Sequence, residues 1–277
     1  MRRGAGKRKR APAAVVAEED DDEWDTSADL VDDTMSSIQL LLNRNTDGFA
    51  AIGLPPLVAW HQLYAILPNR TFVDQNVHRL RDKGKLVTFK IPSGPDDIAI
   101  LRSEDYIAEV EKYQSVFRAQ LIQHPGDKTI SSKLEALSTF GRLLPQLTSL
   151  PTAPLKVLVS KMSASGGSKD EQQMRDMVVR IQRLGFLLPT TRLDDEAYSF
   201  SIPGVGKLIS AIKKTRTQIL TTLKRTKYKE MHGQQLKKAK LKHSTFQLEF
   251  HLADMEGCGL IRRTKVTSGV LVALAEK

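Results

Sequence analysis

The chain has 277 residues, and its 40% hydrophobic and 27% charged residues are typical of a soluble globular protein with two or three small domains. Its 42 Lys and Arg exceed its 32 Asp and Glu, which points to nucleic acid or an anionic membrane surface as a partner. The sequence has neither an apolar run near the ~20 residues of a membrane span nor a secretory signal. Its single cysteine, Cys258, excludes an internal disulfide. We therefore expect a reduced, intracellular chain without a membrane partner.

The first 34 residues consist of charge blocks with few apolar residues. A basic cluster is followed by a spacer of Ala, Pro and Val and then by the acidic run Glu18–Glu23. Such a segment buries too little surface to offset its conformational entropy, so we predict that residues 1–34 form a disordered tail. The basic cluster fits a nuclear-import signal or, alternatively, a generic basic tail. Its residues are Lys7, Arg8, Lys9 and Arg10.

Residues 35–120 show the order of a winged helix, in which three helices precede a two-stranded ribbon. Ser36 or Ser37 is expected to cap the first helix, and Thr71 is expected to cap the third. Prolines directly after Leu54 fit the first turn of the second helix. The expected later elements are a helix at Phe72–Lys83, strands at Leu86–Ile91 and Ile98–Leu101, and a linking helix at Ser103–Arg118.

The same order recurs in residues 121–203 and 204–277. We therefore predict an α+β, mainly α fold with three tandem winged-helix domains behind a disordered N-terminal tail. The second repeat is expected to contain helices at Ser131–Leu144, Leu155–Met162 and Asp170–Leu184, and a hairpin of Phe186–Leu188 with Ala197–Ile202 that turns at Asp194 and Asp195. The third is expected to contain a basic helix, a continuation over Glu230–Leu241, a helix from Ser244 or Thr245 to Met255, and strands at Leu260–Val266 and Val270–Leu274.

The basic excess of the chain is concentrated between Gly204 and Lys242. This stretch has twelve Lys and Arg against a single acid, Glu230. Its apolar residues fall on one helical face, so the opposite face presents positive charge. A solvated charged face is the alternative, but such helices usually intersperse acids, and their near absence favours a polyanionic partner. Two of the expected DNA-binding residues, Arg216 and Lys227, lie near the apolar face, where the alternative is that they anchor the helix against a neighbouring domain. The full set is Lys207, Lys213, Lys214, Arg216, Lys224, Arg225, Lys227 and Lys229.

The third helix of each repeat is the second candidate for DNA contact. In the first repeat we expect Gln75, Asn76, His78 and Arg79 to be exposed, and in the second Gln172, Gln173, Arg175, Arg180 and Arg183. In the third repeat this helix is expected to expose Glu249, Asp254 and Glu256, which a DNA groove would repel, so its wing residues Arg262, Arg263 and Lys265 are the candidates there. Because lysine contacts go mostly to phosphate, we predict weakly sequence-specific binding of double-stranded DNA.

The sequence lacks the motifs of the enzymes that its short matches suggest. Gly204–Leu208 departs from a Walker A loop at both ends, and His78–Asp82 has the wrong spacing for a kinase catalytic loop. Asp-Phe-Gly is absent, and the six histidines do not form a pair at metal-ligand spacing with a third ligand. We therefore predict no catalytic residues, metal or cofactor.

Seven short stretches of the sequence, given at the end of this paragraph, resemble the family named serine/threonine-protein kinase 19, which is also known as a winged-helix repair factor. The resemblance covers roughly Leu54 to Leu274. It implies three winged-helix domains, a nuclear location, DNA binding and a role in transcription-coupled nucleotide excision repair, where the family connects stalled RNA polymerase II and repair-complex proteins to downstream DNA. The matching stretches are Leu54–Pro56, Leu67–Thr71, Glu104–Tyr106, Pro203–Gly206, Lys214–Arg216, Lys227–Glu230 and Thr267–Gly269.

Three functions are consistent with the sequence. The favoured one is a DNA-binding adaptor without an active site. The second is a Ser/Thr protein kinase, as the family name states, although the kinase motifs are missing. The third is a protein-interaction scaffold in a transcription complex, because tandem winged helices often serve in such assemblies.

Overall fold

Three antiparallel sheets of three strands each organise the part of the chain that the structure describes. The structure is a computed structural model, and it describes residues 27–94, 97–166, 170–190 and 196–275. In each sheet the last strand in the sequence lies between the other two, giving the orders β1-β3-β2, β4-β6-β5 and β7-β9-β8. The strands are β1 Val58–Ala59, β2 Leu86–Lys90, β3 Ile98–Arg102, β4 Ala153–Pro154, β5 Leu187–Pro189, β6 Ala197–Phe200, β7 Glu230–His232, β8 Ile261–Val266 and β9 Gly269–Leu274.

The first sheet is buried on both faces. Alternate residues of a strand point to opposite faces, so Leu86 and Ile100 pack on one side and Val87 and Leu101 on the other. The first face is covered by α1 (Ser27–Ile52), the 3-10 helix η1 (Trp60–Ala65) and α2 (Arg70–Asp82), and the second contributes to the largest apolar core. This double burial explains why β2 and β3 are apolar at seven of their ten positions.

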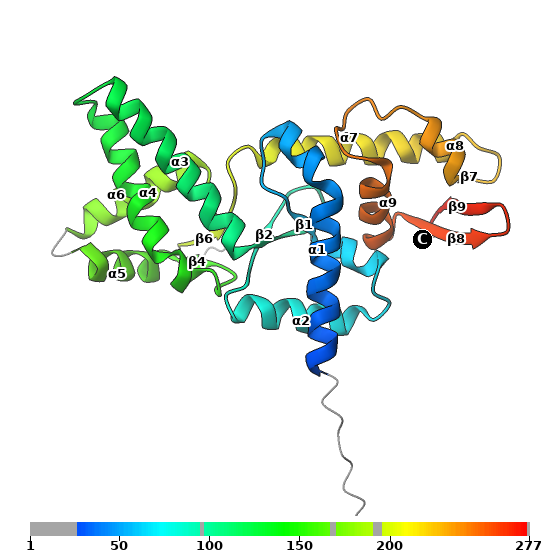
Figure 1. Cartoon of the computed structure of the whole chain (residues 1–277), viewed down its shortest axis with the longest axis horizontal. Helices are drawn as coiled ribbons and strands as arrows, with labels where there is room; N and C mark the ends of the chain where they lie inside the picture. Colours follow the sequence, from blue (N-terminus) through cyan, green and yellow to red (C-terminus); the bar gives the residue numbers. More distant parts are fainter. Residues whose placement is uncertain (1–26, 95–96, 167–169, 191–195, 276–277) are drawn as a thin grey trace, which may run out of the picture.

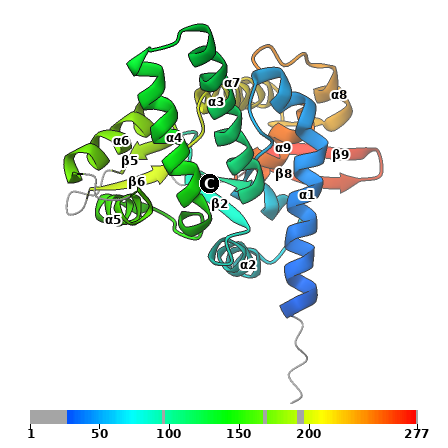
Figure 2. The same ribbon diagram turned by 60° about the vertical axis from the view of Figure 1, so that its left-hand side comes forward.

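The middle of the chain is a helical region around the second sheet (Figure 2). Helix α3 (Ser103–Gln123) turns back into α4 (Lys128–Leu147), whose first turn is capped by the Asp127 carboxylate through the backbone N–H groups of Thr129 and Ile130. Helices α5 (Leu155–Gly166) and α6 (Glu171–Leu184) complete the region. The Tyr106 hydroxyl of α3 donates to the Phe186 carbonyl at 3.1 Å, which fixes α3 against the second sheet.

Helix α7 (Val205–Lys224) spans two cores and joins the middle of the chain to its C-terminal region (Figure 1). Its Leu208 and Ile212 belong to the largest core, whereas Ile219 and Leu223 pack with α8 (Gly233–Lys238), α9 (Leu248–Gly257) and the third sheet. Gly204 precedes the helix at a φ of +84°, a conformation that favours glycine. One long helix thus belongs to two packed regions.

The α+β, mainly helical fold class is confirmed, and the predicted strands lie within two residues of their observed bounds. Four helix predictions are wrong, and so are the two predicted caps. Ser36 and Ser37 lie inside α1, and the cap of α2 is not Thr71 but Asn69, whose side chain accepts the Phe72 N–H at 3.1 Å. Helix α1 begins at Ser27, inside the segment predicted to be disordered up to residue 34, because its later turns are anchored in a core and a helix extends at little cost once it is nucleated. No helix starts at Leu54, where the chain is extended and enters β1 and η1.

The other two corrections concern the third region. Glu230–Leu241 is not a helical continuation, because residues 230–232 pair with β9 as strand β7 before the short α8 begins. The helix predicted from Ser244 or Thr245 begins at Leu248. The predicted turn at Asp194 and Asp195 and the basic cluster Lys7–Arg10 lie outside the described residues.

Candidate nucleic-acid interface

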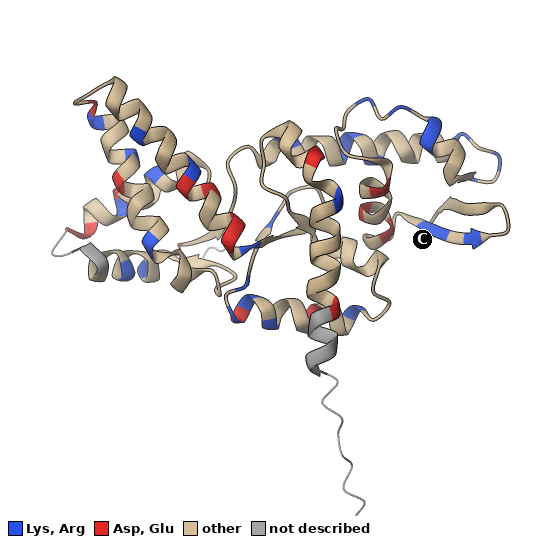
Figure 3. Ribbon diagram, in the orientation of Figure 1, with Lys and Arg blue, Asp and Glu red and all other residues tan. Residues whose placement is uncertain are grey.

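The solvent face of α7 presents exposed cations along the helix. The residues Lys213, Lys214, Lys224 and Arg225 are all exposed, and Lys207 is exposed in the first turn. None of these five side chains has a carboxylate within ion-pair distance among the described residues. Figure 3 shows Lys and Arg on α7 and on the segment that follows it, whereas Asp and Glu gather on α9. The counter-charge for this face must therefore come from outside the described part of the chain.

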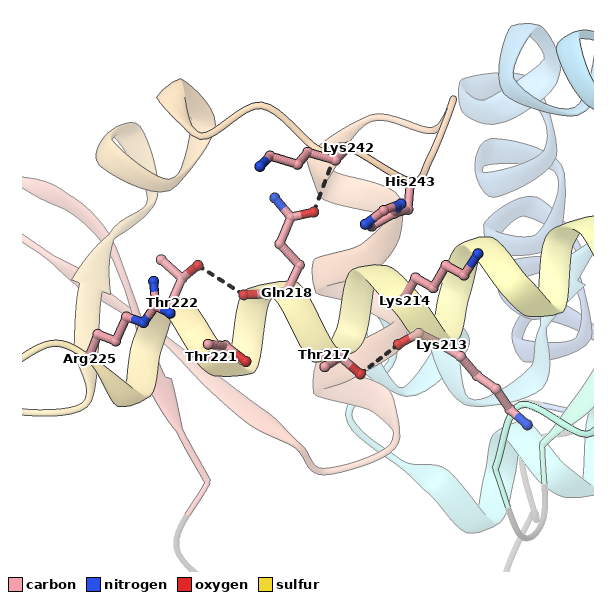
Figure 4. A pocket seen from close by; sticks show the side chains of 9 residues that line it. All are labelled: Lys213, Lys214, Thr217, Gln218, Thr221, Thr222, Arg225, Lys242 and His243. Atoms are coloured by element: carbon pink, nitrogen blue, oxygen red, sulfur yellow. Dashed lines mark hydrogen bonds between the residues drawn. The ribbon is translucent and has the colours of Figure 1, made fainter.

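A groove runs between α7 and the loop that follows α8 (Figure 4). Gln218 builds it, because its amide nitrogen donates to the Lys240 carbonyl at 2.9 Å and its amide oxygen accepts from the backbone N–H of Lys242 at 3.2 Å. These two bonds hold the loop beside the helix. We call this groove, with a volume of about 550 Å³, the basic groove, and its lining is Lys213, Lys214, Thr217, Gln218, Thr221, Thr222, Arg225, Lys242 and His243.

The basic groove combines cations with hydroxyl and amide groups. The hydroxyls of Thr217 and Thr222 donate to the carbonyls four residues earlier, at 3.0 and 2.9 Å, so their oxygens retain acceptor capacity. Lysine, arginine, threonine and glutamine are the side chains that commonly contact DNA phosphates. The groove can therefore bind a row of phosphate groups.

The opposite face of α7 carries Arg216, which is only 8% exposed. Its guanidinium donates to both carboxylate oxygens of Asp254 at 2.7 Å and to Asp97 at 2.9 Å. His61 Nε2 lies 2.7 Å from Asp254 Oδ1, and the Ser93 carbonyl accepts from Arg216 at 3.3 Å. We call the four side chains Arg216, Asp254, Asp97 and His61 the buried network. It joins α7 and α9 to η1 and to the β2–β3 loop.

The charges of the buried network stabilise each other. Burial alone raises the pKa of the Asp254 carboxyl, but hydrogen bonds from Arg216 and His61 outweigh it and hold that pKa below its usual value. Burial lowers the pKa of Arg216, and the Asp254 hydrogen bonds reverse this effect and raise it. The charge of Arg216, one of the predicted DNA-binding residues, is therefore neutralised inside the protein and does not belong to the exposed face of α7. The alternative that it anchors against a neighbouring domain agrees with the contacts.

A family model described as inactive serine-threonine protein kinase 19 matches residues 45–274. The chain belongs to this family. Winged helix repair factor 1 of Dictyostelium discoideum is 27% identical over 92% of this chain and 68% of its own length. Winged helix repair factor 1 of Homo sapiens is 24% identical over 87% of this chain and 85% of its own length, and that of Xenopus laevis is 24% identical over 80% and 76%. The resemblance seen in the sequence is thereby confirmed.

The family is described as inactive, which confirms the prediction that this chain is not a kinase. Among the described residues, groups of His, Cys, Asp and Glu that could hold a metal ion are not found. In the same part of the chain, none of the helices is both long and apolar enough to cross a membrane.

The other cations predicted to bind DNA in the third repeat differ in whether they are exposed or paired with a carboxylate. Lys227, Lys229, Arg262 and Lys265 are exposed. Arg263 instead forms ion pairs with Glu249, at 3.1 Å, and with Glu256. Its charge is thus already balanced within the protein, so Glu249 and Glu256 would compete with a DNA phosphate for Arg263.

The third helices of the three repeats differ in which of their polar side chains are exposed. In α2, Gln75, His78 and Arg79 are exposed, but Asn76 is 1% exposed and bonds Thr34 of α1, so its predicted exposure is wrong. In α9 the predicted exposure of Asp254 is wrong, because this side chain belongs to the buried network.

Helix α6 keeps most of its predicted polar surface. Gln172, Gln173 and Arg183 are exposed, and Arg180 is half-buried. Arg175 is also half-buried, and it pairs with Glu171 at 3.1 Å and with Glu196 at 3.5 Å. These two carboxylates compete with any phosphate for Arg175.

Gln218 and His243 were not among the predicted site residues, and Lys242 was counted only in the basic stretch. Gln218 had a recognisable signal, because it lies four residues after Lys214 and seven before Arg225, on the same face of the helix. Lys242 and His243 had none, because their place beside α7 depends on the path of a loop that follows another helix.

Proposed function

We propose that this protein is a nuclear winged-helix factor that binds duplex DNA through the basic groove and neighbouring cations and acts as an adaptor in transcription-coupled nucleotide excision repair. The relatives are named winged helix repair factor 1, which supports a repair role. In this proposal each three-stranded sheet and its helices form one winged-helix domain, with boundaries near residues 120 and 203. RNA polymerase II and repair-complex proteins are its proposed partners.

The observation that carries the proposal is the row of exposed cations on α7 and at its C-cap, which have no carboxylate partner among the described residues. Lys214 and Arg225 lie eleven residues apart, which corresponds to roughly 16 Å along a helix, or about five base-pair steps of a DNA strand. Gln218 adds Lys242 to this row by holding its loop in place. Because these residues lie on a helix that is anchored in two cores, their backbone positions are already fixed in the protein without DNA. Little ordering is then needed to bind a DNA phosphate backbone.

Weak sequence specificity follows from the burial of α9. In most helix-turn-helix proteins the corresponding helix enters the major groove. Here the central residues of α9 are buried, and its acids pair with Arg216 and Arg263. Cations that contact phosphate position a protein on DNA without reading its sequence. We therefore expect similar affinity for duplexes of unrelated sequence.

A charge-reversal variant tests the proposal. Changing Lys213, Lys214 and Arg225 to Glu should weaken binding of a 20-base-pair duplex at least tenfold at low salt, as measured by fluorescence anisotropy. The wild-type protein should lose affinity steeply with added salt, and the variant should have a log–log slope smaller by roughly 2.7, about 0.9 for each lost phosphate contact.

The matched control reverses the same number of charges elsewhere. Arg118, Lys128 and Lys156 are exposed on α3, α4 and α5, and changing them to Glu alters the net charge equally. This control should bind DNA within about threefold of the wild type. Equal loss in both variants would mean that net charge alone attracts the DNA, and unchanged binding in the first would remove the basic groove from the interface.

Nuclear localisation is a separate part of the proposal and rests on Lys7, Arg8, Lys9 and Arg10. Changing these four residues to Ala in a fluorescent fusion should move the protein from the nucleus to the cytoplasm. Continued nuclear accumulation would assign import to another segment or to a partner.

A further inference from the structure

A tight turn joins α7 to β7 at the end of the basic groove. We call residues 225–229 the α7–β7 turn. Its two ends are fixed, because the Lys229 N–H donates to the Thr226 carbonyl at 3.2 Å and the Lys229 carbonyl accepts from the Leu274 N–H of β9 at 3.1 Å. Thr226 also closes the end of α7 through hydrogen bonds to the Leu223 carbonyl. Lys227 and Tyr228 are therefore the central residues of a turn held on both sides.

The backbone of this turn is unusual. Among the described residues, Lys229 is the one non-glycine residue with a positive φ, at +55°. A long side chain seldom adopts this conformation, and such exceptions gather at functional sites. The turn carries the chain from the end of α7 into β7 (Figure 1), and Tyr228 directly precedes Lys229 in it.

Tyr228 is the tyrosine whose ring lacks a packing role. Tyr106 is buried, Tyr113 and Tyr198 pack against the largest core, and the Tyr64 hydroxyl donates to Asp74 at 2.5 Å. Tyr228 is 71% exposed, and the Lys227 ammonium lies over its ring, 5.2 Å from the ring centroid. Exposing a large aromatic ring forgoes the stability that its burial would give, so the stability of the fold does not account for it.

The surroundings of Tyr228 are strongly positive. Lys224, Arg225, Lys227 and Lys229 are all exposed within four residues of it. Arg225 also lines the basic groove, so the ring lies just beyond the end of the proposed phosphate row. An aromatic ring next to a row of cations is the arrangement with which proteins bind bases that have left the helical stack.

We propose that Tyr228 stacks on an unpaired base of DNA, so that the protein prefers a duplex interrupted by unpaired bases over a fully paired one. This inference rests on the proposed binding of DNA along α7. The cations hold the backbone on either side of the interruption, and the ring replaces the lost stacking of the base. Stacking needs no particular base, because every base has a π-face, so the preference is for DNA structure and not for sequence.

The test compares two probes of equal length and charge, a 20-base-pair duplex and the same duplex with two mismatched pairs at its centre. The wild-type protein should bind the mismatched probe more tightly by a factor of about 5 to 150, the range for stacking one base on an aromatic side chain. Tyr228→Ala should reduce this ratio to about one and leave the affinity for the paired duplex within twofold. Tyr228→Phe and Tyr228→Trp should keep the preference.

A 2-aminopurine placed at the mismatch gives a direct readout of stacking. Its fluorescence should be quenched more by the wild type and by Tyr228→Phe than by Tyr228→Ala. As a matched control, Ile122→Ala removes another exposed apolar side chain, 80% exposed on α3, and should leave both affinities unchanged. Circular dichroism should show that Tyr228→Ala keeps the native fold, because the ring is not packed.

Each outcome is decisive for one of the two proposals. A wild-type ratio of one, an unchanged ratio in Tyr228→Ala, or an equal loss of affinity for both probes in that variant would overturn the role of Tyr228 while leaving duplex binding intact. Failure of the wild-type protein to bind either probe would overturn the proposed function, and the inference with it.

Discussion

The two faces of α7 carry the same kind of residue in opposite circumstances. Lys214 and Arg216 are two positions apart, which places them on different sides of the helix. Lys214 is exposed and has no carboxylate partner among the described residues, whereas Arg216 is bound by Asp254 and Asp97. The outer face therefore leaves its charge for a partner, and the inner face uses its charge to hold the protein together.

This difference shows that a basic stretch is not a uniform binding surface. The charge of Arg216 is needed inside because it links α7 to η1, α9 and the β2–β3 loop. In return, those contacts fix the orientation of α7, and with it the direction in which Lys214 and Arg225 point. The inner face thus positions the outer one, and the two should respond differently to substitution.

The largest expected effect comes from breaking the inner face. Arg216→Ala leaves two buried carboxylates without their cation, so it should lower the free energy of unfolding by about 3–5 kcal/mol, measured by urea denaturation. Arg225→Ala, at an exposed position of the same stretch, should change it by less than about 0.5 kcal/mol. A similar small change in both variants would contradict the distinction between the two faces.

The second prediction tests the contact between α9 and η1 that the buried network spans. A Cβ atom on Gly257 would overlap the carbonyl oxygen of His61, and backbone on both sides prevents relief by a side-chain movement. Gly257→Ala should therefore destabilise the protein by about 3 kcal/mol, at the upper end of the usual cost of overpacking.

Gly206→Ala is the matched control for this glycine. It also lies in a helix, and a Cβ there meets nothing within 4 Å. This change should stabilise the protein by about 0.5–1 kcal/mol, because alanine loses less conformational entropy in a helix. If the two substitutions changed the free energy of unfolding equally, the backbone of α9 at Gly257 would not lie against the His61 carbonyl of η1.

Local patterns were enough to predict the hairpin strands β2, β3, β5, β6, β8 and β9, most helices and the outer face of α7, but they did not predict β1, β4 or β7, the third strand of each sheet. The hairpin of β8 and β9, for example, follows from apolar residues on either side of Thr267-Ser268-Gly269. The exposure of Lys214 and Arg225 follows from helical periodicity alone. These features depend on residues that are close in the sequence.

The buried network could not be predicted in this way. Asp97 and Asp254 lie 119 and 38 residues from Arg216, and no periodicity connects them. Asp254 was expected to face solvent because it is an acid on a short helix, yet α9 is enclosed by η1 and α7 and has no free face at that position. Helix α1 likewise begins upstream of the predicted boundary, and Thr34, the last residue of the predicted tail, accepts a hydrogen bond from Asn76 of α2, 42 residues away in the sequence.

The third prediction concerns pH and the inner side of α9. His251 is buried beside the Phe246 and Phe250 rings, with its Nε2 2.7 Å from the Ser244 hydroxyl. Burial lowers its pKa to about 4, which Asp254 partly offsets and Arg216 reinforces. His251 is therefore protonated below about pH 6.5 in the unfolded chain but only below about pH 4 in the folded protein.

Stability from this group is fully present above pH 6.5 and is lost as the pH falls towards 4. The free energy of unfolding should drop by roughly 2 kcal/mol between pH 7.5 and 5 through His251 alone. In His251→Gln, which keeps a polar group but does not titrate, this part of the pH dependence should disappear. Parallel stability curves for the two proteins would show that His251 is not buried in its neutral form.

The smallest effect on stability is expected on the outer face, where the effect on binding is specific. Lys214→Ala removes an exposed side chain without an ion-pair partner among the described residues, so the free energy of unfolding should stay within about 0.5 kcal/mol of the wild type. Its loss should nevertheless reduce the slope of log affinity against log salt by about 0.9, because one phosphate contact releases roughly that many counterions. Lys156→Ala, at an exposed position of α5, should change neither quantity. A slope that stays the same in Lys214→Ala would place this lysine off the DNA, and the cations towards the α7–β7 turn would then have to account for binding.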